Sequence, residues 1–456
     1  MSLAVVRRSS LNEKKKFLLV HPEISRTKYN FAGVIDNESL ELEYISTMLK
    51  NDGYEVAIWD GQVEKSPLTE KLEQYQPDYV YVCGRTRQEN FMKEYCSAAK
   101  KICGSVTFVG GLHAQHNFER FYEDDIDYII TTFDIYKITD ILNGKTLSDI
   151  DGICYKNDKV WIENQALPFD IEKLPLPDRT YFYEHQDRYR YLELLPCAHV
   201  RTAYCCPYRC KFCYRNRLNC GVYSARSIES VVDEIKTIDC ENIYIIDDDF
   251  LFDVSRVKKF IQLIKEQNIH KKYVCYGRAD FISKNPELMK ELKEIGFYYI
   301  LVGLEAIHDK YLTDYNKLSD MSCNTSAIEI LNDIGINIMG MFIVDLDFTS
   351  RDFSELYKWI KRHKLRHTAI SIFIPEMSSE LMEQYKDRLI TDNPEEWDYL
   401  HIVAKPSRMS VKMYYFYYHI LVAKLFVRGW RDGIYDFIDY GFYIKSILKN
   451  MFRFGG

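Results

Sequence analysis

Three cysteines, Cys206, Cys210 and Cys213, form a C-x3-C-x2-C pattern with an aromatic residue, Phe212, just before the last of them. Thiolates this close together in the sequence can all reach one small inorganic centre, so their loop must wrap around it. A cluster of four irons needs four protein ligands to be closed, as in ferredoxins, and three ligands leave one iron open. Because an open iron can bind a substrate or a cofactor, the pattern favours a reactive centre over an electron carrier.

The same three thiolates could instead hold a zinc ion. A structural zinc site has four closed protein ligands. Cys205, Cys220 or His199 could supply the fourth ligand, so counting residues does not decide between zinc and a cluster. Cys205 also has a simpler interpretation, as a thiol at the end of a strand beside the motif.

The size and composition of the chain limit the class of protein. Its 456 residues exceed what one hydrophobic core usually organises, so we expect two domains and a tail. The net charge of −7, without a basic block, gives no support for a nucleic-acid partner. The odd and scattered set of 13 cysteines indicates reduced thiols and a cytoplasmic location. We expect no signal peptide and no membrane span.

The first third of the chain alternates short apolar runs with amphipathic stretches. Strands are predicted at residues 16–21, 54–59, 78–83, 106–110 and 128–132, and helices at 40–50, 89–101 and 118–122. Short apolar strands joined by helices indicate an α/β fold with a parallel, doubly wound (flavodoxin-like) sheet. In such a sheet, ligands bind outside the carboxyl ends of the strands.

A similar alternation returns after a connector, which holds a predicted hairpin at 152–161 and two prolines that favour extended chain. Strands are predicted at 199–204, 242–247, 273–278, 299–305, 338–344 and 369–374. Six such units fit a partial (β/α)6 TIM-like barrel, with its chemistry at the C-terminal strand ends. We therefore expect a sheet domain at 14–145, a linker at 146–192, a barrel at 193–380 and a mostly helical region at 381–456.

The stretch 413–422 in this last region is aromatic or apolar on every face. A helix that is apolar all round is usually buried. We therefore expect it to dock against the barrel, with a lipid-facing or substrate-covering role as the alternative.

The cysteine pattern resembles that of the radical S-adenosylmethionine (SAM) superfamily. The resemblance implies a [4Fe–4S] cluster on Cys206, Cys210 and Cys213, with SAM bound through its amino and carboxylate groups to the open iron. One electron from the reduced cluster, supplied by a partner such as flavodoxin or ferredoxin, would split SAM into methionine and a 5′-deoxyadenosyl radical. Phe212 would lie against the adenine.

The resemblance extends to the ends of the later barrel strands. Asp248 and Asp249 follow the second strand, where the family holds the SAM ammonium, and a carboxylate suits that group. Their alternative is a solvated turn that caps the next helix. Arg278 and Glu305 end the third and fourth strands, where polar groups face SAM, although each could form an ordinary ion pair. Asp345 follows the fifth strand, where relatives commonly have Gly-Leu-Pro.

The N-terminal region resembles the cobalamin-binding domain of one radical SAM branch. Gly110 and Gly111, after the fourth strand, would let a large ligand approach the backbone closely. His113 follows them, and its alternative is a buried imidazole bonded to a neighbouring loop. Arg85 and Arg87 place two bulky cations in the loop after the third strand, where a corrin would need space.

This branch implies cobalamin-dependent methyl transfer to an unactivated carbon of a small-molecule or lipid substrate. The cofactors would then be the cluster, SAM and cobalamin, and the protein would orient them. Without cobalamin, the same radical could drive a dehydration, a cyclisation or an oxidation. A third interpretation is an interaction protein stabilised by zinc or iron–sulfur, which would not cleave SAM. No residue is assigned as a catalytic acid.

Overall fold

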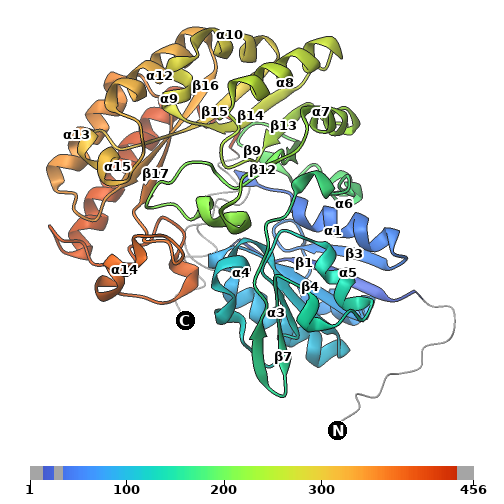
Figure 1. Cartoon of the computed structure of the whole chain (residues 1–456). Coiled ribbons are helices and arrows are strands. Elements are labelled where there is room, and N and C mark those ends of the chain that lie inside the picture. The colour runs from blue at the N-terminus through green and yellow to red at the C-terminus, as the bar shows by residue number, and fades with distance from the viewer. Residues whose placement is uncertain (1–13, 25–33, 439–456) are drawn as a thin grey trace.

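A computed structural model describes residues 14–24 and 34–438 of the chain. It contains two α/β parts, each built on its own sheet, which lie against each other (Figure 1). The predicted α/β class is confirmed.

The N-terminal sheet has seven strands in the order β3-β1-β4-β5-β6-β7-β8. These strands are β1 (Lys16–His21), β3 (Glu55–Asp60), β4 (Tyr79–Cys83), β5 (Val106–Gly110), β6 (Tyr128–Ile130), β7 (Ile153–Asn157) and β8 (Val160–Glu163). Its helices are α1 (Leu40–Asn51), α2 (Leu68–Tyr75), α3 (Glu89–Cys103), α4 (Gly111–Asn117) and α5 (Tyr136–Leu142). The first five strands in this order are parallel.

Both faces of this sheet are buried, as the unbroken apolar runs predict. Along β1, Phe17 and Leu19 pack into one apolar cluster with residues of α1 and α5. Leu18 and Val20 point the other way and pack with residues of α2 and α3. The doubly wound sheet is thus confirmed. The predicted hairpin also forms, as β7 and β8, and it extends the sheet by antiparallel pairing with β6.

The second sheet has six strands in the order β10-β13-β14-β15-β16-β17, all of them parallel. They are β10 (Cys197–Val200), β13 (Asn242–Ile245), β14 (Lys272–Gly277), β15 (Phe297–Glu305), β16 (Asn337–Val344) and β17 (His367–Ile372). Its helices are α7 (Ile228–Thr237), α8 (Val254–Glu266), α9 (Ala279–Lys284), α10 (Pro286–Glu294), α11 (Asp309–Asp314), α12 (Met321–Ile334) and α13 (Ser350–Arg362). This is the predicted partial barrel.

The connector ties the two parts together. It holds α6 (Thr180–Glu184) and β9 (Arg190–Tyr191), which pairs with β2 (Ile35–Asp36). The buried guanidinium of Arg179 makes ion pairs with Glu38, ahead of α1, at 2.7 Å and with Glu234, on α7, at 2.8 Å. A buried cation needs such partners, because its desolvation is otherwise costly.

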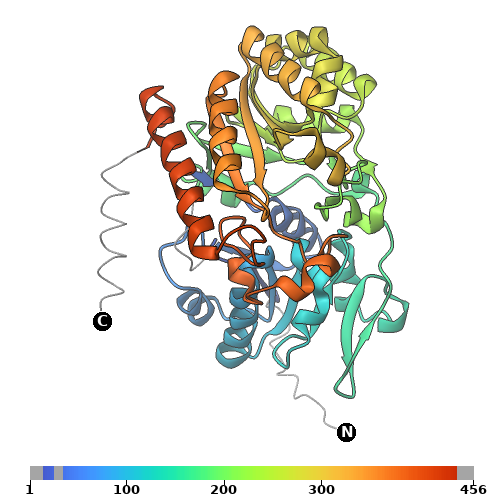
Figure 2. The same cartoon turned by 90° about the vertical axis from the view of Figure 1, so that its left-hand side faces the viewer.

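After β17, the described chain first returns to the N-terminal part and then packs its last described helix against the barrel. Beyond α14 (Met382–Tyr385), a short 3-10 helix, η7 (Pro394–Glu396), lies against another, η1 (Thr86–Gln88). Asn90 Nδ2 donates a hydrogen bond to Glu395 Oε1 at 3.0 Å. The last described helix, α15 (Val411–Arg431), then runs along the outside of the barrel next to α13 (Figure 2).

Only one face of α15 is buried. Tyr414, Tyr418, Leu421 and Leu425 pack against the barrel, and the Tyr414 hydroxyl donates to the Val344 carbonyl oxygen at 2.8 Å. The predicted docking is confirmed for this face, but the expectation of burial all round is wrong, because the opposite face has no helix of the described chain upon it. None of the described helices combines the length and apolarity that crossing a bilayer requires.

Candidate active site

The cysteine loop lies between the two-residue strand β11 (Ala203–Tyr204) and the 3-10 helix η5 (Arg215–Gly221), at the C-terminal ends of the barrel strands. The segment that follows β15 holds this loop in place. Lys211 N donates to the Tyr315 carbonyl oxygen at 3.0 Å, and Asn316 Nδ2 donates to the Arg209 carbonyl oxygen at 2.8 Å. The loop is therefore fixed by a strand connection that lies about a hundred residues further along the sequence.

The three predicted ligands, Cys206, Cys210 and Cys213, are all free thiols. Burial raises the pKa of Cys206 and raises that of Cys213 to about 12, so a free thiolate is disfavoured at these positions. A bound metal centre reverses this preference, because it stabilises the thiolate directly. The donor set thus fits a metal centre better than it fits an isolated reactive thiolate.

The spacing of the three sulfur atoms favours a cluster over zinc. A zinc ion binds each thiolate at about 2.3 Å, which keeps any two of its sulfur ligands within about 4.6 Å of each other. Within residues 14–24 and 34–438, the one set of three His, Cys, Asp or Glu ligand atoms that all lie within 4.8 Å of one another is His308, Asp352 and Glu355. The cysteines are spread more widely, which fits a cluster in which each thiolate binds a different iron.

The three aspartates after β13, at positions 247–249, have different contacts. Asp247 accepts hydrogen bonds from the Thr202 and Ala203 backbone amides at 2.7 and 3.0 Å, so it holds the start of the cysteine loop. Asp248 forms an ion pair with Arg215, which stands two positions after Cys213. Both carboxylates are engaged within the protein.

Asp249 differs from its two neighbours. It is buried, and neither of its side-chain oxygens has a hydrogen-bond partner in the described protein. Burial raises its pKa well above the usual carboxyl value, although Arg278, Lys317 and, less strongly, the Leu251 backbone amide, which is close but outside hydrogen-bond geometry, act in the opposite direction. A buried carboxylate without a partner is costly unless a ligand completes its hydrogen bonds. Asp249 therefore fits the predicted contact with an ammonium group, and Asp248 fits it less well.

Arg278, at the end of β14, supports the cysteine loop. Its guanidinium lies 3.8 Å from the centroid of the Tyr208 ring, and its Nη1 is 3.9 Å from Cys210 Sγ. Its Nε donates to Asp280 at 2.8 Å, and its Nη2 donates to the Lys317 carbonyl oxygen. These contacts place a fixed positive charge beside one predicted ligand, where it would stabilise a thiolate.

Glu305, at the end of β15, is already paired. Lys317 Nζ donates to Glu305 Oε1 at 2.7 Å, and both side chains are about 90% buried. A Cβ on Gly303 would lie 2.3 Å from that oxygen, so the glycine makes room for the pair. The alternative of an ion pair thus describes Glu305, although the pair stands beside the predicted SAM site.

Phe212 lies edge-on to Tyr315, with 5.2 Å between ring centroids. Tyr315 donates from its hydroxyl to Asp345 Oδ2 at 2.6 Å. Asp345 is the residue that replaces the usual Gly-Leu-Pro loop. Its role in the structure is to fix the tyrosine against which Phe212 packs. The half-buried Phe212 ring is the one predicted adenine contact, and that role stays a prediction.

Sequence reasoning missed the partners that pair across strands. Arg215 and Tyr208 both act on predicted residues, but no local pattern distinguishes them from surface residues. Lys317, by contrast, belongs to the pair Asn316-Lys317, which resembles a pair that recurs in one radical SAM subfamily, although the sequence did not indicate its partner Glu305. Glu376, after β17, was missed for the same reason as Arg215. It is buried and accepts a hydrogen bond from the Tyr399 hydroxyl, and burial raises its pKa. The spacing of ligands is visible in the sequence, whereas these contacts join distant segments.

The predicted cobalamin residues have internal contacts. A Cβ on Gly110 would meet the Tyr81 hydroxyl at 2.0 Å, and a Cβ on Gly111, whose φ is +86°, would meet the Gly84 backbone nitrogen at 3.0 Å. The glycines therefore admit neighbouring parts of the same sheet. Their contact with a corrin stays a prediction.

His113 is a buried imidazole bonded to a neighbouring element, as its alternative interpretation expects. Its Nε2 lies 2.7 Å from Glu89 Oε2, on α3. The same carboxylate pairs with Lys93, at 3.0 Å, and with Arg120. Burial alone would raise the pKa of Glu89, but the hydrogen bonds from His113 and Arg120 outweigh it and lower the pKa to about 2.

Replacement of Glu89 by Gln should remove an acid-sensitive part of the stability. The folded pKa of about 2 lies below the ordinary value of 4.5, so the contribution is complete above pH 4.5 and disappears as the pH falls towards 2. Its size is about 3 kcal/mol at neutral pH. Urea unfolding of the parent and of Glu89→Gln at a series of pH values measures it. A difference between the two proteins that stays constant from pH 7 to pH 3 would contradict the assignment.

The hollow between the two parts is small. Arg85, Thr86 and His113 line it from the N-terminal side, and Tyr214 and Glu376 line it from the barrel side. Its volume is about 20 Å³, which is room for one water molecule. This hollow by itself does not hold a corrin, and cobalamin would bind there only if the Arg85 loop and the Glu376 segment moved apart.

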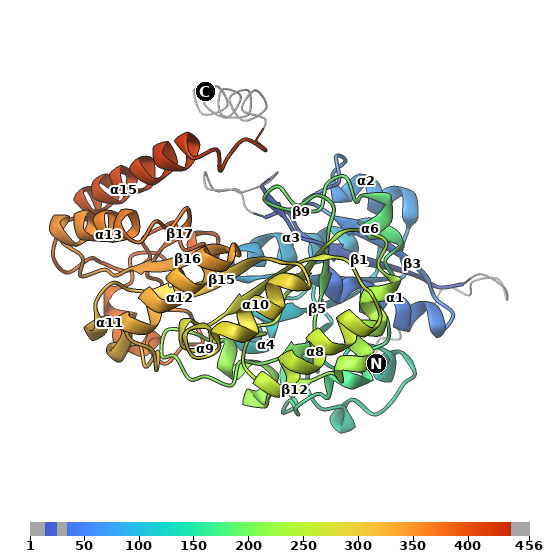
Figure 3. The ribbon, with the colours of Figure 1, turned by 90° about the horizontal axis from the view of Figure 1, so that it is seen from above.

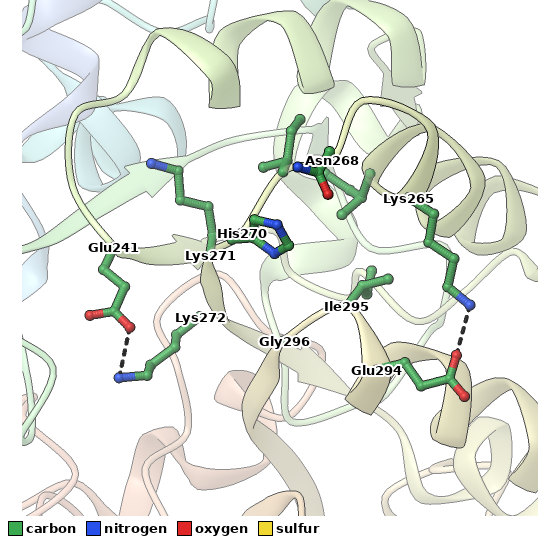
Figure 4. Close-up of a pocket in the computed structure, with 11 residues that line it drawn as sticks. Glu241, Lys265, Asn268, His270, Lys271, Lys272, Glu294, Ile295 and Gly296 are labelled. Atoms are coloured by element: carbon green, nitrogen blue, oxygen red, sulfur yellow. Dashed lines mark hydrogen bonds and ion pairs between the residues drawn. The ribbon is translucent and has the colours of Figure 1, made fainter.

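A larger hollow, of about 350 Å³, lies at the opposite ends of the barrel strands from the cysteine loop. Figure 4 shows the residues that line it. Its lining includes Asn268, His270 and Gly296, at the starts of β14 and β15. Two of its walls carry the ion pairs Lys265–Glu294 and Lys272–Glu241. It opens at the N-terminal ends of the strands, whereas the active sites of such barrels lie at the C-terminal ends.

Two known domain families match the chain. Residues 200–360 match the radical SAM superfamily, and residues 34–133 match the B12 binding domain. The chain is 24% identical over 399 residues to a hopanoid C-3 methylase of Methylococcus capsulatus. The matched region covers 83% of this chain and 74% of the methylase. It is also 24% identical over 400 residues to an anaerobic magnesium-protoporphyrin IX monomethyl ester cyclase of Cereibacter sphaeroides. That matched region covers 80% of this chain and 63% of the cyclase.

Solved structures share the fold. The radical SAM methyltransferase TsrM of Kitasatospora setae, with cobalamin and a [4Fe–4S] cluster bound, superposes with a TM-score of 0.70 at 15% identity and covers 91% of each chain. The cobalamin-dependent radical SAM enzyme OxsB superposes with a TM-score of 0.64 at 19% identity, over 82% of this chain and 55% of OxsB. The sheet, the partial barrel and the helical C-terminal region therefore occur together in this fold.

Proposed function

From the premise that the chain is a radical SAM enzyme with an N-terminal B12-binding domain, we propose that it transfers a methyl group to an unactivated carbon, with cobalamin as a cofactor. The observation that carries the SAM chemistry is the buried, partnerless carboxylate of Asp249 beside three free thiols. Support for methyl transfer comes from the B12-binding domain and from the likeness to a hopanoid methylase and to a cobalamin-containing methyltransferase.

The residues of this chain would act by binding and orienting. Cys206, Cys210 and Cys213 would hold the cluster, and Asp249 would accept hydrogen bonds from the SAM ammonium. Arg278 would keep the cysteine loop in position through its contacts with Tyr208 and Cys210. When bound, the cluster and SAM supply an electron and a carbon radical that removes a substrate hydrogen atom, and cobalamin supplies the route for the methyl group.

The substrate of this reaction would be a small molecule or a lipid. Each turnover would need two electrons, one for the reductive cleavage of SAM and one to restore the corrinoid, and both would come from a partner such as flavodoxin or ferredoxin, in the cytoplasm. Two SAM molecules would be consumed in each turnover. One loses its methyl group and leaves S-adenosylhomocysteine. The other is reductively cleaved to methionine and, after it takes the hydrogen atom, 5′-deoxyadenosine.

A radical reaction without cobalamin is the second candidate. The hollow of about 20 Å³ between the two parts favours it, and so does the likeness to a magnesium-protoporphyrin ester cyclase. Dehydration, cyclisation or oxidation would each use the same cluster and SAM contacts. The third interpretation, an interaction protein that holds zinc, has less support, because the three sulfur atoms are spread too widely for one ion.

The products of SAM distinguish these candidates. Protein reconstituted anaerobically with iron and sulfide, then incubated with dithionite, SAM and hydroxocobalamin, should form 5′-deoxyadenosine. It should also form S-adenosylhomocysteine, and only when the corrinoid is present. Formation of 5′-deoxyadenosine alone, with no corrinoid retained on gel filtration, would replace methyl transfer by the second candidate. Absence of both products would contradict the proposal as a whole.

A further inference from the structure

The outer face of α15 carries large apolar side chains that stay about half exposed, although the Phe426 ring stacks on that of Tyr435 with 5.0 Å between ring centroids. Phe416, Phe426, Val427 and Trp430 are 54%, 45%, 45% and 58% exposed, and they stand opposite the buried residues of the same helix. We call these four residues the α15 outer face. Exposed apolar patches of this kind mark surfaces that bind a partner or a membrane. The helix has 21 residues and is about 30 Å long, and the α15 outer face covers about 20 Å of that length, from Phe416 to Trp430.

Cations lie along one side of this face. Between Lys358 and Arg366, at the end of α13, the chain has five Lys or Arg residues and no Asp or Glu. Within α15 itself it has four Lys or Arg residues and again no Asp or Glu. The chain as a whole has a net charge of −7, so these two stretches oppose the overall charge of the protein.

Contacts between α13 and α15 join the two basic stretches into one surface. Arg366 Nη2 donates to the Asp432 carbonyl oxygen at 2.8 Å, and Lys424 Nζ lies 5.5 Å from the centroid of the Tyr357 ring. Figure 3 shows the two helices side by side at the outer edge of the barrel. The α15 outer face and the cations of the two basic stretches therefore form one continuous surface.

Most of these cations are not neutralised by the protein. Lys358, Lys361, Arg362 and Lys364 are exposed or nearly so, and none of them forms an ion pair with another residue in the described part of the chain. Elsewhere on the barrel, several lysines are paired, Lys259 with Glu229 at 3.2 Å, Lys265 with Glu294 at 2.7 Å and Lys290 with Glu287 at 2.7 Å, and the exposed lysines without an ion pair, such as Lys236, Lys258 and Lys284, are on separate helices. The positive charge is thus concentrated where the apolar face is exposed.

We propose that the α15 outer face and the basic end of α13 dock the enzyme on an anionic lipid membrane surface. An amphipathic helix lies in the plane of such an interface, with its apolar face among the acyl chains and its cations at the headgroups. Each Lys or Arg near the surface adds attraction to anionic lipids. A second copy of the chain is a poorer occupant, because two-fold pairing of this surface would bring like charges together.

Vesicle binding by the full-length, reconstituted protein tests the proposal. The protein should sediment with vesicles of equal parts phosphatidylglycerol and phosphatidylcholine, less with pure phosphatidylcholine, and less again at high salt. Lys358→Glu/Lys361→Glu/Arg362→Glu should weaken binding to the anionic vesicles at least about tenfold. Phe416→Ser/Trp430→Ser should also weaken it. SAM cleavage should be the same in all these variants, since none of the altered residues lies at the cysteine loop.

A matched control is available on the other side of the barrel. Lys236, Lys258 and Lys284, on α7, α8 and α9, are exposed and have no ion-pair partner in the described structure. Changing all three to Glu alters the net charge equally, so vesicle binding should stay near that of the parent. Equal loss in both triple variants would reduce the effect to overall charge and overturn the proposal. So would absence of vesicle binding by the parent, or a dimer in solution that Phe416→Ser/Trp430→Ser dissociates.

Discussion

Replacement of Cys206, Cys210 or Cys213 by Ala, one at a time, should reduce formation of 5′-deoxyadenosine to the level seen without enzyme. Two thiolates cannot hold a four-iron cluster with one open position, so each variant should also lose iron and the visible absorbance of the cluster. Iron and sulfide analysis after anaerobic reconstitution, together with chromatography of the SAM products, measures both effects.

Cys220→Ala is the matched control for this result. Cys220 is an exposed free thiol on η5, close to the motif in sequence, and its sulfur donates only to the Ala166 carbonyl oxygen, at 3.4 Å. Its replacement should leave iron content and SAM cleavage unchanged. Loss of the metal centre in Cys220→Ala would mean that a fourth side chain closes the site, and reductive SAM cleavage could not then be the function.

Asp249→Ala should weaken SAM binding while it leaves the unliganded fold as stable as the parent or more so. A lost charge-assisted hydrogen bond costs about 1.5–3 kcal/mol, which is at least about tenfold in affinity. The unliganded protein loses no hydrogen bond, because both side-chain oxygens of Asp249 lack partners. Calorimetric titration with SAM and urea unfolding without it separate the two effects.

The pH dependence of that stability difference follows from the raised pKa of Asp249. Its folded pKa lies above its unfolded pKa, so the parent loses stability as the pH rises from the unfolded value through the folded value. The Ala variant has no such loss. Its advantage should therefore be absent at acid pH and grow as the pH rises.

Asp247→Ala is the contrasting substitution, only two positions away. It would leave the Thr202 and Ala203 amides without their acceptor, so it should destabilise the protein by about 2 kcal/mol or more. An Asp249→Ala variant that is destabilised as much as Asp247→Ala, with unchanged SAM affinity, would show that Asp249 is a structural residue and remove it from the site.

Much of the fold could be predicted because it is written in short-range patterns. The strand at 16–21 and the helix at 40–50 show apolar runs and periodicities that reflect burial on two faces or on one. The expectation for α15 failed in part for a related reason. Aromatic residues occur on all its sides, and periodicity alone cannot tell which side meets the barrel and which stays exposed.

The candidate site was predictable in its ligands and not in its supports. The spacing of Cys206, Cys210 and Cys213 is a local property, so the sequence shows it directly. In the acidic run after β13, Asp248 and Asp249 were predicted as candidates for the ammonium contact, but the sequence could not tell these two apart. Only the different neighbours of the three aspartates, the Thr202 amide for Asp247 and the Arg215 guanidinium for Asp248, leave Asp249 free for a ligand.

The sequence by itself determined the order of the strands along the chain, the two α/β parts and the three thiols that can meet at one centre, because each depends on residues close together in the chain. The tertiary structure decided which side chains reach those thiols, which carboxylate lacks a partner and which basic stretches lie side by side. Those facts depend on contacts between segments that are distant in sequence. Such contacts are set by how the whole chain packs, so no single segment predicts them.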